Sequence, residues 1–173
     1  MKQTESETVY DGKQIDVHIA TYRYSDGEEA EREVVTHPGA VAIIAHDDEV
    51  IWLVRQPREA VGEDALLELP AGKLDVEGES RIECAQRELI EECGLEASEW
   101  TELKRFYTSP GFADEEVTIF LATGLEQVES EPADPEERIE IVRWPVDDID
   151  VAIEECFDAK SLIGLLLLRE RLR

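Results

Sequence analysis

One stretch of the chain, residues 72–95, constrains the fold and the chemistry more than any other. It reads GKLDVEGESRIECAQRELIEECGL. Ser80 and Glu83 have the spacing of a capping box, which starts a helix, and Gly94 stands where a left-handed residue ends one. The apolar residues between these signals recur at steps of three and four: Ile82, Ala85, Leu89 and Cys93. We therefore expect an amphipathic helix between Ser80 and Gly94.

Three carboxylates share another face of this expected helix. Glu88, Glu91 and Glu92 stand at positions i, i+3 and i+4. Like charges this close repel, and a hard divalent cation such as Mg2+ would remove that cost because it takes oxygen ligands. An ordinary solvated acidic face is the plainer interpretation, since the chain holds 43 acidic residues. The residues around the helix decide between the two.

The whole stretch resembles the Nudix box, G-x5-E-x7-R-E-U-x-E-E-x-G-U, in which U is an apolar residue. The match is complete from Glu79 to Leu95. Six residues, not five, separate Gly72 from Glu79, and the extra one falls in the turn at 75–78, where loops absorb insertions at little cost. The resemblance implies an α+β fold, an α/β/α sandwich with a mixed β-sheet.

The same resemblance implies a hydrolase that uses Mg2+, with Mn2+ as the alternative ion, to cleave a pyrophosphate bond. Such ions neutralise phosphate oxygens and lower the pKa of a bound water. The metal ligands that it implies are Glu88, Glu91, Glu92 and the backbone carbonyl of Ala71. Glu91 is also expected among the catalytic residues. Arg87 is expected to pair with a nearby carboxylate such as Glu79.

Residues outside the box resemble the ADP-ribose pyrophosphatase subgroup of that family. Arg55 and Arg58 stand in V-R-Q-P-R, similar to the V-R-Q-Y-R of the subgroup, and Glu68 stands in E-L-P-A-G. Pro110, sixteen positions past Gly94, is a further mark of the subgroup. The substrate that the resemblance implies is ADP-ribose, cleaved to AMP and ribose 5-phosphate.

These flanking residues have expected roles, each with a plainer alternative. The two arginines are expected to grip the diphosphate, because Arg binds phosphate oxygens bidentately; the alternative is a pair of exposed surface arginines. Glu68 is an outer ligand, a substrate contact or a plain loop residue. Phe112 either lies against the adenine or ribose or fills a turn beside Pro110. The general base is expected from the acidic loop before the last strand, as Glu136 or Glu137.

The charge of the chain limits its partners. Its 43 acidic and 17 basic residues give a formal net charge of −26. Such an excess destabilises a compact chain by self-repulsion, and molar salt reduces the screening length to about 3 Å. We therefore interpret the protein as halophilic; an acidic surface for a basic partner is the weaker alternative. Nucleic acids and anionic membranes are disfavoured as partners because both need basic patches.

A single domain is expected from the 173 residues. Residues 1–38 are predicted to form an antiparallel β-meander after a frayed polar start at 1–8, and residues 39–173 to form the catalytic core. In that core, a linker is expected directly after Arg58. Strands are predicted at 40–45, 50–54, 102–107, 117–123 and 139–144, and a C-terminal helix at 159–172. The resemblance implies that the meander joins two subunits, so we expect a homodimer.

Cysteine usage and apolar runs bear on the compartment. The three cysteines, Cys84, Cys93 and Cys156, are too scattered for a disulfide framework and fit a reducing, cytoplasmic setting. No signal peptide is expected, because residues 1–7 are polar and acidic. The longest apolar run, 162–168, is far shorter than the roughly 20 residues that span a bilayer.

Three rival functions remain open at this point. The first is hydrolysis of another nucleoside diphosphate derivative, such as NADH or a nucleotide sugar, by the same site. The second is a non-catalytic Nudix-like domain that senses ADP-ribose or nucleotides, and the intact glutamate trio argues against it. The third is a structural or interaction module that uses the N-terminal meander as an assembly surface.

Overall fold

The computed structural model describes residues 1–129 and 138–173. The chain forms two compact units. The first unit consists of Met1–Gly39 and Phe106–Glu116, and the second consists of Ala40–Arg105 and Val117–Arg173. Each unit is described below by itself.

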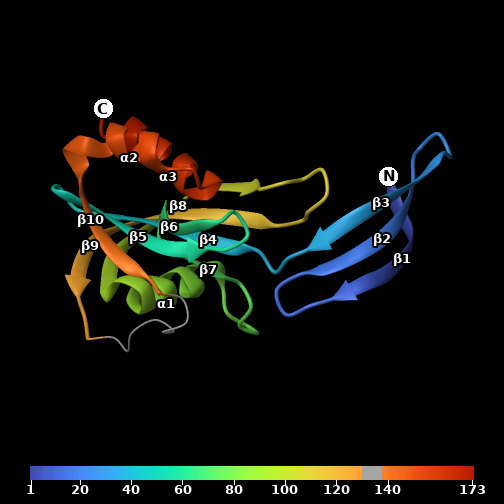
Figure 1. Ribbon diagram of the computed structural model, residues 1–173, viewed down its shortest axis with the longest axis horizontal. Coiled ribbons are helices and arrows are strands. Elements are labelled where there is room, and N and C mark those ends of the chain that lie inside the picture. The colour runs from blue at the N-terminus through green and yellow to red at the C-terminus, as the bar shows by residue number, and fades with distance from the viewer. Residues whose placement is uncertain (130–137) are drawn as a thin grey trace. The chain divides into compact units, whose positions relative to one another are not determined.

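The first unit is built on an antiparallel meander, as the sequence predicts (blue in Figure 1). Its strands, in the spatial order β1-β2-β3, are β1 (Lys2–Asp11), β2 (Asp16–Arg23) and β3 (Glu29–Thr36). The expectation that the first eight residues fray is wrong, because they form most of β1 and pair with β2. Every residue of β1 is exposed, so this strand has no apolar alternation by which the sequence could reveal it.

A mixed β-sheet forms the centre of the second unit. Its strands are β4 (Ala40–His46), β5 (Val50–Arg58), β6 (Glu63–Glu68), β7 (Ala71–Lys73), β8 (Leu95–Tyr107), β9 (Glu116–Gln127) and β10 (Glu140–Pro145). The main path runs β10-β5-β4-β9-β8, while β6 pairs with β5 and β7 pairs with β4. The pairing of β4 with β9 is parallel, whereas β4 with β5 and β5 with β10 are antiparallel. The expected linker after Arg58 therefore contains a strand, β6.

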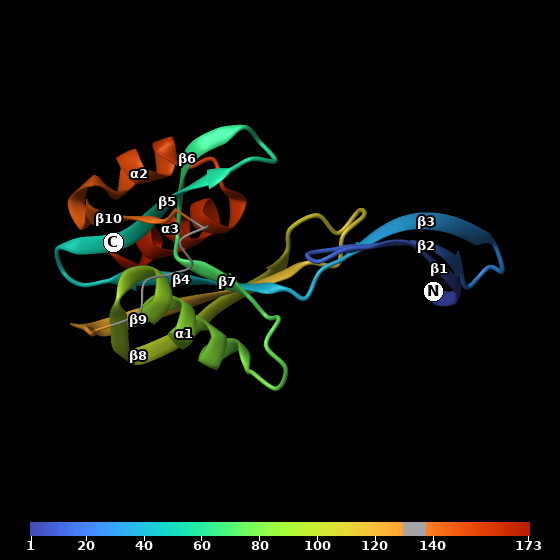
Figure 2. The same ribbon diagram turned by 60° about the horizontal axis from the view of Figure 1, so that its bottom comes forward.

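Helices cover both faces of this sheet, which confirms the α/β/α sandwich (Figures 1 and 2). The elements are α1 (Arg81–Cys93), the short 3-10 helix η1 (Val146–Asp148), α2 (Ile149–Glu155) and α3 (Ala159–Arg171). α1 lies on one face, and α2 and α3 lie on the other. Within residues 1–129 and 138–173, no helix has the length and apolar character to cross a membrane.

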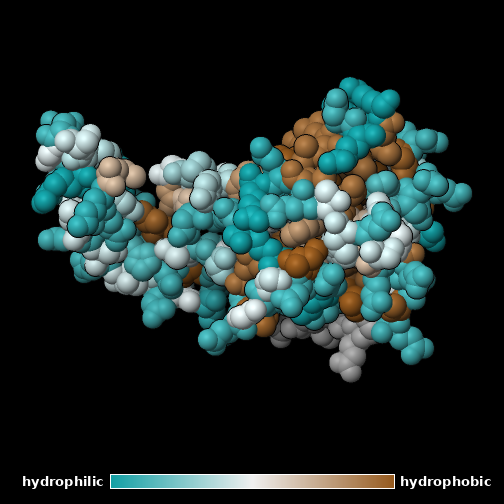
Figure 3. All heavy atoms as spheres, turned by 180° about the vertical axis from the view of Figure 1, so that it is seen from behind, coloured by the Kyte–Doolittle hydropathy of each residue, from teal (hydrophilic) through white to brown (hydrophobic). Residues whose placement is uncertain are grey.

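The core explains why the central strand reads as a continuous apolar run. Residues 40–45 of β4 are all buried, because α1 packs on one face of the sheet and α3 on the other. Leu89 of α1 and Leu165 of α3 are both almost wholly buried. Seen from behind, apolar side chains gather over the two C-terminal helices (Figure 3). Phe157, which connects α2 and α3, and Leu166 of α3 are exposed. The three cysteines are free and buried, and burial raises the pKa of Cys84 to about 12.

Candidate active site

The helix that carries the acidic residues begins and ends as its sequence predicts. The backbone N–H of Glu83 donates to Ser80 Oγ, and the backbone N–H of Ser80 donates to Glu83 Oε2 at 2.9 Å. The Ser80 hydroxyl also donates to Glu83 Oε2, and this hydrogen bond, together with the one from the Ser80 backbone, lowers the pKa of Glu83. Gly94 ends the helix with φ 64°. The extra residue of the box lies in a turn in which the N–H of Glu79 donates to the Val76 carbonyl at 3.2 Å, so the helix register is unaffected.

Arg87 gathers three carboxylates of the box around one guanidinium. Its Nε and Nη2 donate to the two oxygens of Glu79 at 2.8 and 3.0 Å, which confirms the expected pair. Its Nη1 donates to Glu88 Oε1 at 2.6 Å and to Glu91 Oε2 at 3.0 Å. The hydrogen bonds from Arg87 hold the pKa of Glu79 below its usual range. One positive charge therefore offsets much of the repulsion on this face of α1.

Two of the box glutamates meet the backbone of β7. The side chain of Glu92 is almost buried, and its Oε2 accepts a hydrogen bond from the Ala71 N–H at 3.0 Å. A Cβ atom added at Gly72 would overlap the Glu88 carboxyl group. Glycine leaves room for the Glu88 carboxylate at this position, which explains why the first residue of the box is a glycine. Glu88, Glu92 and the Ala71–Gly72 backbone thus converge on one place.

The donor set at this place fits a hard divalent cation. It consists of the carboxylate oxygens of Glu88 and Glu92, and Mg2+ and Mn2+ favour oxygen ligands. Glu91 is more exposed, at 46% of its side chain, and is held by Arg87. In the part of the chain that the structure describes, no three His, Cys, Asp or Glu side chains are already grouped as an ion would need.

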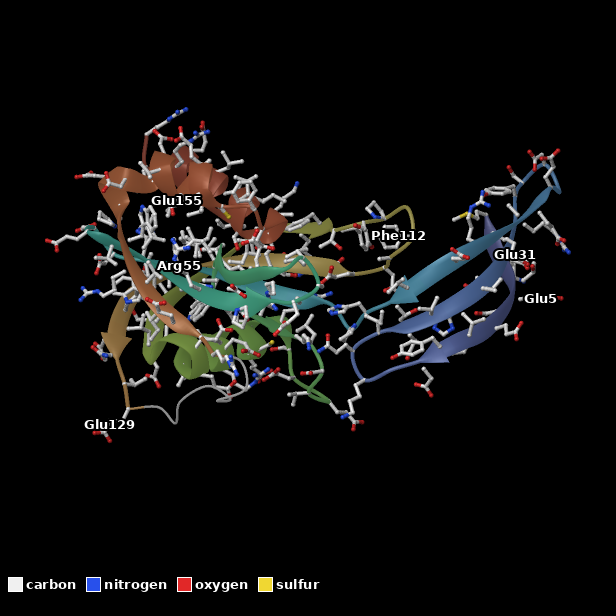
Figure 4. The ribbon with its side chains drawn as sticks, in the orientation of Figure 1. Glu5, Glu31, Arg55, Phe112, Glu129 and Glu155 are labelled. Carbon is white, nitrogen blue, oxygen red and sulfur yellow. The ribbon has the colours of Figure 1, made fainter. Side chains whose placement is uncertain are left out.

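The two arginines of β5 are each engaged with a carboxylate. Arg58 donates from Nε and Nη2 to the two oxygens of Glu68 at 2.6 and 2.7 Å. Arg55 donates to Glu155 Oε2 of α2 at 3.1 Å and to the Ala65 carbonyl at 3.3 Å (Figure 4). The side chains of Arg55 and Arg58 are 31% and 42% exposed. The hydrogen bond to Glu68 raises the pKa of Arg58, so its guanidinium stays charged.

Glu68 is the buried centre of a polar network that the sequence reasoning missed. Only 1% of Glu68 is exposed, and its Oε2 also accepts a hydrogen bond from Lys160 Nζ at 2.5 Å. Lys160 donates as well to Asp158 Oδ2 at 2.9 Å. Burial works against the charged form of Asp158, but Lys160 and hydrogen bonds from Ser161 outweigh it and lower the pKa of Asp158. The sequence signal that could have revealed this network is Lys160, which stands two residues after the helix N-cap Asp158 in a chain with few lysines.

Pro110 and Phe112 belong to the first compact unit. Their loop is attached to β3, since the Val35 N–H donates to the Phe112 carbonyl at 2.7 Å and the Asp114 N–H donates to the Val35 carbonyl at 3.1 Å. The Phe112 side chain is 58% exposed (Figure 4) and borders a shallow hollow of about 420 Å³ beside Arg32. Glu136 and Glu137, the candidate bases, lie outside the described residues.

Comparison with known proteins agrees with this geometry. Residues 35–163 match the family model described as NUDIX domain. The chain is 39% identical to an ADP-ribose pyrophosphatase of Bacillus subtilis (strain 168), over 99% of this chain and 95% of that protein. It is 46% identical to an ADP-ribose pyrophosphatase of Mycobacterium tuberculosis, over 80% of this chain and 67% of that protein. A crystal structure of an ADP compounds hydrolase matches with a TM-score of 0.85 and 29% identity, over 99% of this chain and 93% of that one.

Proposed function

The chain belongs to the Nudix family, and on that premise we propose that it hydrolyses ADP-ribose to AMP and ribose 5-phosphate with a divalent metal ion. The names of two relatives that match most of the chain, both ADP-ribose pyrophosphatases, support the substrate. The observation that carries the chemistry is the convergence of Glu88 and Glu92 on the Ala71–Gly72 backbone.

Mg2+ is the proposed ion, with Mn2+ as the alternative. The residues that would hold it are Glu88, Glu92 and the Ala71 carbonyl, with Glu91 beside them. When bound, such an ion neutralises the diphosphate and supplies an activated water. Arg87 has a separate role, because its hydrogen bonds to Glu79 and Glu88 hold these two side chains in position.

Arg55 and Arg58 are proposed to bind the diphosphate. Both lie in the second half of β5 and both are charged donors, so a phosphate group can compete for them with the carboxylates that they now contact. Pro110 and the exposed ring of Phe112 are proposed to contact the adenine or ribose. Glu136 or Glu137 is proposed as the general base that takes the proton of the attacking water.

A homodimer formed through the meander is proposed as the working assembly. The edge strand β1 is exposed along its whole length, and Val9 and Tyr10 on it are 51% and 57% exposed. Exposed edge strands are ready templates for pairing with a second chain. Light scattering at high salt should give the mass of two chains, whereas the mass of one chain would reject this assembly. We further propose a cytoplasmic, salt-adapted protein, on the grounds of its charge and free cysteines.

The rival functions predict different results from one experiment. The purified chain is given ADP-ribose, NADH and a nucleotide sugar in turn, with Mg2+ and at KCl concentrations up to molar, and kcat/KM is measured for each. The proposal predicts the highest kcat/KM for ADP-ribose. A higher value for NADH or the sugar would move the assignment to that substrate. Binding of ADP-ribose without turnover of any of the three would favour a sensing domain.

A further inference from the structure

The Glu68 carboxylate has two cationic partners that differ in their surroundings. Arg58 lies at the rim, with 42% of its side chain exposed, whereas Lys160 is only 15% exposed. Arg58 reaches both oxygens of Glu68, and Lys160 reaches Oε2 at 2.5 Å. Lys160 also pairs with Asp158 at 2.9 Å, so it serves two carboxylates at once. Arg58, the more exposed of the two cations, is therefore the one that can leave Glu68.

The energetic reason lies in the cost of an unpaired buried charge. If Arg58 turned from Glu68 to a substrate phosphate while Glu68 had no other partner, a carboxylate that is 1% exposed would be left uncompensated. Removing one member of a buried ion pair is strongly destabilising for this reason. With Lys160 in place, Glu68 keeps a cation at hydrogen-bonding distance when Arg58 leaves.

Lys160 is held close to Glu68 by the contacts of the helix that carries it. It stands in the first turn of α3, whose N-cap Asp158 accepts hydrogen bonds from Lys160 and from the Ser161 backbone N–H, at 2.9 and 3.0 Å. Ser161 Oγ in turn accepts a hydrogen bond from the backbone N–H of Leu69 at 2.7 Å. The N-terminus of α3 is thus tied to the residue directly after Glu68. Lys160 cannot readily follow Arg58 toward the solvent.

We propose that Lys160 is a positioning residue that holds the Glu68 charge when Arg58 transfers to a substrate phosphate. The proposal rests on the proposed function, in which Arg58 binds the diphosphate. It assigns to the C-terminal helix a direct influence on substrate affinity. Lys160 is expected to affect the Kd for the substrate, because Arg58 moves from Glu68 to the phosphate when the substrate binds.

The test is a double-mutant cycle in which ADP-ribose binding is measured by calorimetry in EDTA, where metal-dependent turnover is stopped. Lys160→Met should raise Kd by about tenfold, less than a fully buried pair would give because Arg58 is partly exposed. Lys160→Met combined with Glu68→Gln should return Kd to near the wild-type value, because position 68 then carries no charge that holds Arg58 back from the phosphate. Lys160→Arg should also retain most of the affinity.

Steady-state kinetics and a charge control complete the test. With Mg2+, Lys160→Met should raise KM with little change in kcat, and the exposed Lys104→Met, which removes the same charge, should change neither. Unchanged Kd in Lys160→Met, or a double variant that binds as weakly as Lys160→Met, would overturn the proposal. Hydrolysis of ADP-ribose by the wild-type chain is scored separately, so a failure of the proposed function is distinguishable from a failure of this inference.

Discussion

Replacing Arg87 by Met tests whether one guanidinium holds the acidic face of α1 together. Arg87 is 29% exposed and bonds to Glu79 and Glu88, whose side chains are only 11% and 13% exposed. Removal leaves these partly buried carboxylates without that cation. Losing one member of a buried ion pair costs roughly 3–5 kcal/mol. We expect a loss of about 3 kcal/mol in the free energy of unfolding, at the low end because the site is not fully dry.

Arg105→Met provides a matched control. Arg105 also donates two hydrogen bonds to a single glutamate, Glu102, both at 2.7 Å. These side chains are 44% and 41% exposed, however, so solvent screens the pair. Exposed pairs contribute at most about 1 kcal/mol. The two variants remove the same charge, from a partly buried cluster of three glutamates in one case and from an exposed pair in the other.

The assay is thermal unfolding followed by circular dichroism, in EDTA and at one fixed KCl concentration. For a chain of this size, 1 kcal/mol shifts Tm by about 2–4 °C. Arg87→Met should therefore lower Tm by roughly 6–12 °C and Arg105→Met by less than about 4 °C. Added Mg2+ should recover part of the loss in Arg87→Met, because binding to the folded state stabilises it. Equal shifts for the two variants would refute the argument from burial.

Three further predictions follow from single features of the structure. Gly72→Ala should weaken Mn2+ binding by at least about tenfold in calorimetry, because the new Cβ would overlap the Glu88 carboxyl group; unchanged affinity would exclude a ligand at Glu88. The lowered pKa of Asp158 means that its stabilisation is full above its ordinary pKa near 4 and is lost as pH falls through the lowered value. Urea unfolding between pH 2 and 6 should therefore show the advantage of wild type over Asp158→Asn shrinking with acid, and a constant difference would contradict the sign. With a net charge of −26, Tm should rise as KCl is raised from about 0.1 to 1 M and the screening length falls; a flat or falling Tm would count against salt adaptation.

The helix α1 was predictable because its signals are local. Ser80, Glu83 and Gly94 cap α1 within one continuous stretch, and the structure confirms each of them. Arg87 and Glu79 are eight positions apart and meet as expected. Capping chemistry and helical spacing act over a few residues, so a single sequence contains all that is needed to infer them.

The parts that escaped prediction depend on contacts far apart in the chain. β1 is exposed and polar, and only its hydrogen bonds to β2 make it a strand. β6 follows a loop and is defined by pairing with β5. Lys160 and Glu68 are 92 positions apart, and neither local pattern nor composition predicts that a lysine of α3 meets a carboxylate of β6. The sequence motif identified Glu68 and Arg58, but their bond to each other comes from the fold.

Product analysis of ADP-ribose hydrolysis tests the central claim most directly. Wild type and Glu92→Gln are incubated with ADP-ribose and Mg2+ at KCl concentrations up to molar, and the products are separated by chromatography. Wild type should form AMP and ribose 5-phosphate in equal amounts. Glu92→Gln, which keeps the shape of the side chain but loses its charge at the Ala71 backbone, should be at least about a hundredfold slower. Absence of AMP at every salt concentration, or a full rate in Glu92→Gln, would contradict the account.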